Sequence, residues 1–140
     1  MTTSSLSLSR KLLIGEALKR AAHQYPEKEA FIYGDTRLSY RSLEQRASHI
    51  AGWLQERGMK RNEKVGILAK NSLTSVEVFF GIALSGSVGV AINFRLKFAE
   101  MEYIINHSDM KFLFVEEEYA DLIQSMRDRL PKLEEVIVIG

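Results

Sequence analysis

The sequence has 140 residues, 46% of them hydrophobic and 26% charged, which is the size and composition of one soluble globular domain. Its 19 basic and 18 acidic residues leave a formal charge of +1, so the chain lacks the positive field that attracts nucleic acid. The absence of cysteine excludes disulfides, thiolate metal sites and a cysteine nucleophile, and it fits a reducing compartment such as the cytoplasm.

The amino-terminal end is predicted to be a tail that precedes the folded part. Residues 1–10 are rich in serine and threonine and lack the apolar core of a secretory signal, although a transit peptide is an alternative for a Ser-rich start without acidic residues. No apolar run approaches the roughly 20 residues that cross a bilayer. We therefore expect a disordered tail over residues 1–10, a folded part over residues 11–140, and a soluble protein with no transmembrane segment.

A helix and a hairpin are the first predicted elements. Apolar residues recur at helical spacing up to Pro26, which predicts an amphipathic helix over residues 13–24. Two strand-like pieces follow, 30–33 and 37–39, and Gly34 between them supplies the positive φ that a tight turn needs.

The next predicted helix has a signal at each end. Ser39 is placed to cap its amino terminus, and Gly58 stands just past its last apolar position, near residue 57, where a left-handed cap favours glycine. Its predicted buried stripe consists of Leu43, Ala47, Ile50, Ala51 and Leu54.

Two short apolar runs, 65–69 and 88–92, flank a helix-length segment that is apolar on nearly every side. This pattern predicts a buried strand-helix-strand crossover at the centre of an α/β sheet. The candidate caps of the helix are Asn71, Ser72 and Thr74. Of these, Thr74 has capping-box spacing with Glu77.

The remaining chain continues the alternation of helices and strands. We predict a helix over 98–106, a strand over 111–115, a helix from 117 to about 129 and a strand over 136–139. The fold class is therefore α/β, a largely parallel sheet with helices on both faces plus a small N-terminal hairpin. Because no helix follows to cover the last strand, we expect the incomplete N-terminal part of a larger domain.

Three glycines near the central crossover, Gly81, Gly86 and Gly89, invite comparison with a phosphate loop. The chain has no Gly-Lys-Ser/Thr and no Gly-x-Gly-x-x-Gly leading from a strand into a helix. We interpret Gly81 as a site of close packing, Gly86 as a helix cap and Gly89 as the entry to a strand.

Histidine and serine chemistry is also weakly supported. His23, His49 and His107 lie on different predicted helices or at their ends without a second ligand at helical spacing, which disfavours a metal site. Ser85 or Ser87 could pair with a histidine as a nucleophile, but the Gly-x-Ser-x-Gly elbow is absent.

Two polar clusters complete the candidates. The carboxylates 116–118 could serve acid-base chemistry or Mg²⁺, yet acidic residues at a helix start are also favoured by the helix dipole. Asn93, Arg95 and Lys97 follow a strand, where Arg95 could hold an anion or simply tie neighbouring loops together. From the residues alone we assign no catalytic, cofactor-binding or metal-binding residue.

Several segments, taken in order, resemble the N-terminal part of the adenylate-forming (AMP-binding) acyl-CoA synthetase and ligase family. The resemblance covers roughly residues 12–140. Its segments are Tyr25-Pro26-Glu27-Lys28-Glu29-Ala30, Leu38-Ser39-Tyr40-Arg41-Ser42-Leu43, Val65-Gly66-Ile67-Leu68-Ala69-Lys70-Asn71-Ser72, Ala91-Ile92-Asn93-Phe94-Arg95-Leu96 and Glu102-Tyr103-Ile104-Ile105-Asn106-His107-Ser108.

The resemblance implies a function for the full-length protein. Members of the family convert a carboxylic acid and ATP, with Mg²⁺, into an acyl-adenylate that CoA captures as a thioester. The phosphate loop and the catalytic lysine of that chemistry are not found in this chain. We therefore expect a scaffold segment of a fatty acid–CoA ligase that binds no cofactor itself, is inactive alone, and works with the rest of the ligase chain or a complementing subunit. The alternative is a stand-alone doubly wound binding or interaction module.

Overall fold

The strands form two separate sheets. The computed structural model describes residues 13–140, and the tail predicted for residues 1–10 lies outside this range. A small antiparallel sheet pairs β1 (Glu29–Tyr33) with β2 (Thr36–Ser39). The larger sheet is parallel in the order β4-β3-β5-β6, with β3 at Lys64–Leu68, β4 at Val88–Ala91, β5 at Phe112–Glu116 and β6 at Glu135–Ile139.

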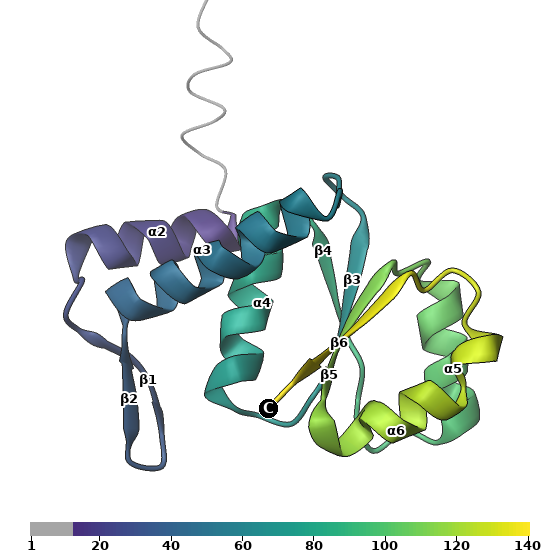
Figure 1. Ribbon diagram of the computed structural model, residues 1–140. Coiled ribbons are helices and arrows are strands. Elements are labelled where there is room, and N and C mark those ends of the chain that lie inside the picture. The colour runs from purple at the N-terminus through teal and green to yellow at the C-terminus, as the bar shows by residue number, and fades with distance from the viewer. Residues whose placement is uncertain (1–12) are drawn as a thin grey trace, which may run out of the picture.

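Helices cover both faces of the parallel sheet, as predicted. Helices α3 and α4 lie on one face, and α5 and α6 lie on the other (Figure 1). The helices are α2 (Ile14–Gln24), α3 (Tyr40–Glu56), α4 (Leu73–Ser85), α5 (Phe98–His107) and α6 (Glu117–Ser125), followed by the 3₁₀ turn η1 (Arg127–Arg129). The α/β fold class and the small hairpin are therefore confirmed.

Strand β5 shows how one sheet serves two cores. Phe112 and Phe114 point to the α3 and α4 side, where the Trp53 ring lies 6.1 Å from each of them. Leu113 and Val115 point the opposite way, into the core formed with α5 and α6. Successive residues of a strand face opposite sides of the sheet, so a run that is apolar at every position is buried on both.

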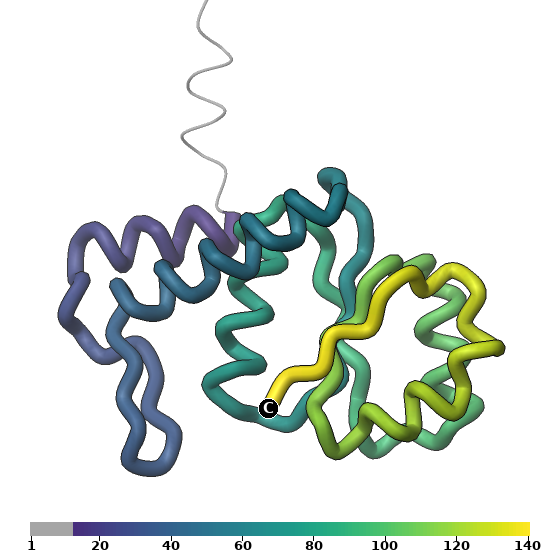
Figure 2. Tube along the Cα trace, viewed as in Figure 1, coloured from purple at the N-terminus to yellow at the C-terminus, as the bar shows by residue number. Residues whose placement is uncertain are grey.

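Helix α2 and the first half of α3 pack on α4 rather than on the parallel sheet, whereas the end of α3 reaches the sheet through Trp53 and Leu54. Helices α2 and α3 lie side by side and both contact α4, while the β1–β2 hairpin projects away from the parallel sheet (Figure 2). These elements enclose a third hydrophobic cluster, separate from the two on the faces of the parallel sheet. Its buried centre includes Leu18 of α2, Leu38 of β2 and Leu43 of α3. The hairpin is thus tied to the main sheet mainly through α3 and α4.

The central crossover differs in one respect from the prediction. Strand β3 is an interior strand, but β4 is an edge strand that pairs only with β3 in the described part of the chain. Val88 on β4 is 43% exposed and Phe79 on α4 is 44% exposed. The expectation of a crossover buried on every side was therefore wrong for β4 and for one side of α4, because no described element packs beyond them.

The predicted caps of α3 are confirmed. The Ser39 hydroxyl accepts a hydrogen bond from the Ser42 amide at 3.2 Å. At the other end Gly58 adopts φ +84°, and its amide donates to the Gln55 carbonyl at 3.0 Å. Both ends of this helix are therefore satisfied by the residues that the sequence indicates.

The amino terminus of α4 is capped by one of the three candidates. Ser72 and Ser75 form a reciprocal capping box, with distances of 3.1 Å and 3.0 Å between each hydroxyl oxygen and the other residue's amide. The Thr74–Glu77 capping box was wrong, because the Glu77 carboxylate instead accepts from the Arg46 guanidinium of α3 at 2.7 Å. Gly86 closes α4 with φ +82°, as predicted.

The helix predicted from 117 to about 129 is shorter and is followed by a tighter turn. Helix α6 ends at Ser125, and η1 continues as a 3₁₀ turn. The Arg129 carbonyl at the end of this turn accepts a hydrogen bond from the Asn106 side-chain amide of α5 at 2.9 Å. None of the helices described between residues 13 and 140 has the length and apolar character that crossing a bilayer requires.

Candidate functional site

The carboxyl ends of β3 and β5 form the topological switch point of the sheet. These strands are neighbours, yet β3 leads to α4 on one face and β5 leads to α6 on the other. Open α/β sheets bind their ligands in the crevice that this divergence creates. The loops after β3, β4 and β5 are therefore the first place to look for functional side chains.

Lys70 joins the loop after β3 to the start of α6. Its amide donates to the Glu116 carboxylate at 2.8 Å, and its ammonium pairs with Glu118 at 2.5 Å. The same ammonium lies 5.9 Å from the centre of the Tyr119 ring. The hydrogen bond to Glu118 raises the pKa of Lys70 above its ordinary value, so this lysine stays charged at neutral pH.

An aromatic stack continues from Tyr119 to the loop after β4. The rings of Tyr119 and Phe94 are 6.1 Å apart and 25° from parallel. The Arg95 guanidinium lies 5.6 Å from the centre of the Phe94 ring. Side chains that follow the ends of β3, β5 and β4 are thus joined in the order Lys70, Tyr119, Phe94 and Arg95.

The three polar residues predicted to follow β4, Asn93, Arg95 and Lys97, have different roles in the structure. The side-chain Oδ1 of Asn93 accepts from the Arg95 backbone amide at 2.9 Å, which fixes the local turn. Lys97 belongs to the next element, where its amide donates to Glu100 at 2.7 Å at the start of α5. Within the described residues neither the Arg95 guanidinium nor the Lys97 ammonium forms an ion pair with a carboxylate, and Arg95 is the one whose side chain belongs to the aromatic stack.

The acidic cluster 116–118 does not form a metal site. Glu116 and Glu118 are both engaged by Lys70, and Glu117 lies exposed in the first turn of α6. Among residues 13–140 no group of three histidine, aspartate or glutamate side chains is arranged to hold a metal ion. His23, His49 and His107 are exposed on three different helices, as expected from their positions in the sequence.

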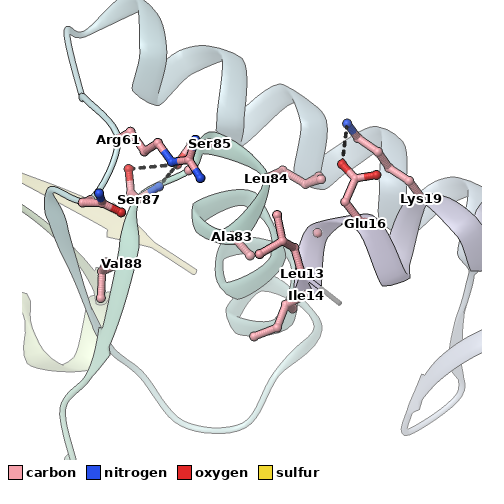
Figure 3. Close-up of a pocket in the computed structure, with 13 residues that line it drawn as sticks. Leu13, Ile14, Glu16, Lys19, Arg61, Ala83, Leu84, Ser85, Ser87 and Val88 are labelled. Atoms are coloured by element: carbon pink, nitrogen blue, oxygen red, sulfur yellow. Dashed lines mark hydrogen bonds and ion pairs between the residues drawn. The ribbon is translucent and has the colours of Figure 1, made fainter. Parts of the chain in front are cut away.

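A cavity of about 590 Å³ opens at the opposite edge, beside the amino end of β4 (Figure 3). Ser85 and Ser87 line it, with their hydroxyl oxygens 2.9 Å apart. The Ser85 hydroxyl also lies 2.7 Å from the Ile82 carbonyl, to which it donates. No histidine is among the described lining residues, so these serines lack the base that an activated nucleophile requires.

The rest of this cavity is mainly apolar. Its walls include Ile14 of α2, Leu84 of α4 and Val88 of β4, and the ion pair between Lys19 and Glu16 stands at its rim with a separation of 3.6 Å (Figure 3). Three glycines near the cavity have the roles predicted from the sequence: Gly81 packs closely on α3, Gly86 caps α4, and Gly89 stands at the start of β4. A cavity at the amino ends of parallel strands lies away from the usual ligand edge.

Sequence reasoning missed Lys70 and Tyr119 as members of the switch-point group. Lys70 comes directly after the predicted strand 65–69, which is a usable signal for a ligand-edge position. Tyr119 carries no such signal, because its ring reaches Phe94 only through the parallel pairing that places β5 beside β3.

The chain is similar to acid–CoA ligases in sequence. The family described as AMP-binding enzyme matches residues 18–140. The 4-hydroxybutyrate–CoA ligase 2 of Metallosphaera sedula is 38% identical over 113 residues, which are 81% of this chain and 21% of that protein. This chain thus spans about a fifth of the length of this relative.

Solved structures extend the similarity to the fold. The anthranilate CoA ligase AuaEII in complex with anthranoyl-AMP superposes with a TM-score of 0.86 and 34% identity, over 90% of this chain and 24% of that one. The N-terminal domain of FACL13 from Mycobacterium tuberculosis also gives a TM-score of 0.86, with 27% identity, over 91% of this chain and 34% of that one. The resemblance seen in the sequence is confirmed, and the chain belongs to the AMP-binding enzyme family.

Proposed function

We propose that this chain is the N-terminal scaffold of an ATP-dependent acid–CoA ligase that acts through an acyl-adenylate. The observation that carries this proposal is the family match over residues 18–140, together with the fold shared with a CoA ligase bound to anthranoyl-AMP. Folds alone do not fix function, so the sequence similarity to acid–CoA ligases is the essential part of the argument.

The proposed substrate is a carboxylic acid, with a fatty acid as the specific candidate. The named relatives act on acids as different as 4-hydroxybutyrate and anthranilate, which supports the carboxylate as the common group. We place the protein in the cytoplasm, in keeping with its lack of cysteine.

ATP, Mg²⁺ and CoA belong to the complete enzyme in this proposal. The described residues do not fit Mg-ATP, because Glu118 is paired with the Lys70 ammonium, Glu116 accepts from the Lys70 backbone amide, and the sequence contains no Gly-Lys-Ser/Thr phosphate loop. The chain alone is therefore inactive and depends on the rest of a ligase chain or on a complementing subunit. Its own contribution is the rigid switch-point edge, where Arg95 is the candidate contact for an anionic group of a ligand.

Two measurements test this proposal. The isolated chain, mixed with Mg-ATP and 4-hydroxybutyrate, butyrate or octanoate, is expected to release no pyrophosphate above a control without acid. A chimaera, in which residues 18–140 replace the corresponding part of the Metallosphaera sedula ligase, is expected to form the CoA thioester. Sustained pyrophosphate release by the isolated chain contradicts its inactivity, and a folded chimaera without ligase activity contradicts the scaffold role.

A further inference from the structure

Helix α4 has the composition of a helix that is surrounded by protein. Its sequence, Leu73 to Ser85, contains one charged residue, Glu77. The Glu77 side chain is only 13% exposed and pairs with Arg46 of α3 at 2.7 Å. A helix that is apolar all round is normally buried in a large core.

The described residues cover α4 on only part of its circumference. Helices α2 and α3 contact one side, and β3 and β4 contact another. On the remaining side Phe79 is 44% exposed, and Phe31 of the hairpin is 37% exposed. Two phenylalanine rings exposed to this degree at one place are unusual on the solvent-facing surface of a complete folded protein.

These rings border one cavity of about 350 Å³, which we call the aromatic groove. Phe79 and Phe80 pack edge to face there, with ring centres 5.4 Å apart. Its apolar lining is formed by Phe31, Ile67, Ala69, Val76, Phe79, Phe80, Ala91 and Ile92, and its polar lining by Lys70, Asn71 and Ser75. Tyr33, exposed by 58%, lies two residues after Phe31 and therefore on the same face of β1.

We propose that the aromatic groove is the docking surface for the part of the ligase fold that this chain does not span. This inference rests on the proposed function. The chain accounts for 24% of the AuaEII ligase structure, so most of that fold lies elsewhere and has to contact this segment.

The chemistry of the groove favours this occupant. Lys70 is its one charged residue among the described lining residues, and its charge is already paired with Glu118. The partner surface is therefore apolar and includes side chains that fill the space between Phe31 and Phe79, in the manner of a core divided between two parts of one protein. The β4 edge beside the groove also leaves its outer backbone groups without a strand partner in the described chain.

Thiol labelling tests this assignment, because the chain has no cysteine of its own. We would prepare Phe79→Cys and Phe31→Cys, with Tyr103→Cys as the matched control, in the isolated chain and in the Metallosphaera chimaera. Tyr103 is 64% exposed and lies on α5, on the opposite side of the sheet. Peptide mass spectrometry then gives the modification rate at each introduced thiol.

The expected result is at least a tenfold slower modification at positions 79 and 31 in the chimaera, with the rate at 103 nearly unchanged. Equal rates at 79 and 31 in both proteins overturn the assignment, as does equal protection at all three positions. A rate at 79 that falls as the isolated chain is concentrated identifies a second copy as the occupant and also overturns it. An active chimaera with an unprotected Cys at 79 refutes the docking surface but leaves the proposed function intact. An inactive chimaera in which positions 79 and 31 are protected supports the docking surface but contradicts the proposed function.

Discussion

Gly81 of α4 lies directly against Ile50 of α3. A Cβ atom built on Gly81 would be 2.5 Å from the Ile50 Cγ2 atom and 3.1 Å from the Ala47 backbone carbonyl oxygen. Two carbon atoms that are not bonded to each other do not approach to 2.5 Å, so the present separation of these two helices requires that residue 81 has no side chain. The close approach of α3 and α4 therefore depends on Gly81.

The first prediction concerns this contact. Gly81→Ala is expected to destabilise the chain by about 1 to 3 kcal/mol, because α3 and α4 must move apart or strain. Gly52→Ala is the control, since a Cβ there meets nothing within 4 Å and alanine favours a helix interior by roughly 0.5 to 1 kcal/mol. Urea denaturation followed by Trp53 fluorescence measures both, and a neutral Gly81→Ala contradicts the packing argument.

The second prediction separates two possible caps of α4. Ser72→Ala removes the hydroxyl that accepts from the Ser75 amide and is expected to cost about 1 kcal/mol. Thr74→Ala, at the position that the sequence pattern favours, is expected to change stability by less than about 0.5 kcal/mol. Equal costs for the two substitutions would mean that the capping box is not the dominant interaction.

The third prediction uses the ion pair between Glu63 and Lys111, whose charged atoms are 2.6 Å apart. The hydrogen bond from Lys111 lowers the pKa of Glu63 below its ordinary 4.5, and the same bond raises the pKa of Lys111 above 10.5. The lowered carboxyl pKa adds stability above pH 4.5 that is lost as the pH falls through the folded value. The raised lysine pKa adds stability below pH 10.5 that is lost as the pH rises through its folded value.

We therefore expect the difference in unfolding free energy between the wild type and Lys111→Met to be greatest between these two values and to narrow in acid. Urea unfolding at a series of pH values from neutral downwards gives this difference directly. Glu56→Gln, at an exposed position on α3, serves as the comparison. A Lys111→Met difference that stays constant into acid argues against the ion pair as its source.

The fourth prediction concerns the attachment of β6 to α3. Arg57 Nη1 lies 2.8 Å and 3.0 Å from the two Glu135 carboxylate oxygens, and the guanidinium lies 4.7 Å from the centre of the Trp53 ring. Arg57→Ala removes both contacts and is expected to cost about 1 kcal/mol, more than Glu135→Gln, because exposed ion pairs and stacking each contribute a fraction of that. If the two substitutions cost the same in chemical denaturation, the ring contact adds nothing.

The predicted elements and the observed ones agree where the signal is local. The cap at Ser39 and the left-handed Gly58 depend on neighbours within one helix, and both are confirmed. The predicted buried stripe of α3 is confirmed except at Ile50, which is half-buried. The position of β4 at an edge depends on which strands pair, and an apolar run such as 88–92 does not encode its neighbours. The competition for Glu77 between Thr74 and Arg46 was likewise decided by a residue of another helix.

The candidate site was predictable only in part for the same reason. Arg95 and Asn93 were found because they follow a strand directly, which is a property of the chain order. The stack of Lys70, Tyr119 and Phe94 brings the loops after β3 and β4 to the first turn of α6, and none of these three segments alone indicates the contact. Lys97 stands at the start of α5, where its backbone amide donates to Glu100.

The interior position of β3 has a consequence for synthesis of the protein. This strand leaves the ribosome before β4 and long before β5, so its backbone groups stay unpaired until these two strands have been synthesised. The strands of the β1–β2 hairpin, in contrast, can pair with each other as soon as both have emerged. Parallel pairing across such distances in the chain is slow to form. We expect nascent chains that end before Phe112 to remain sensitive to protease throughout β3, and protection to appear only after Val115 has emerged.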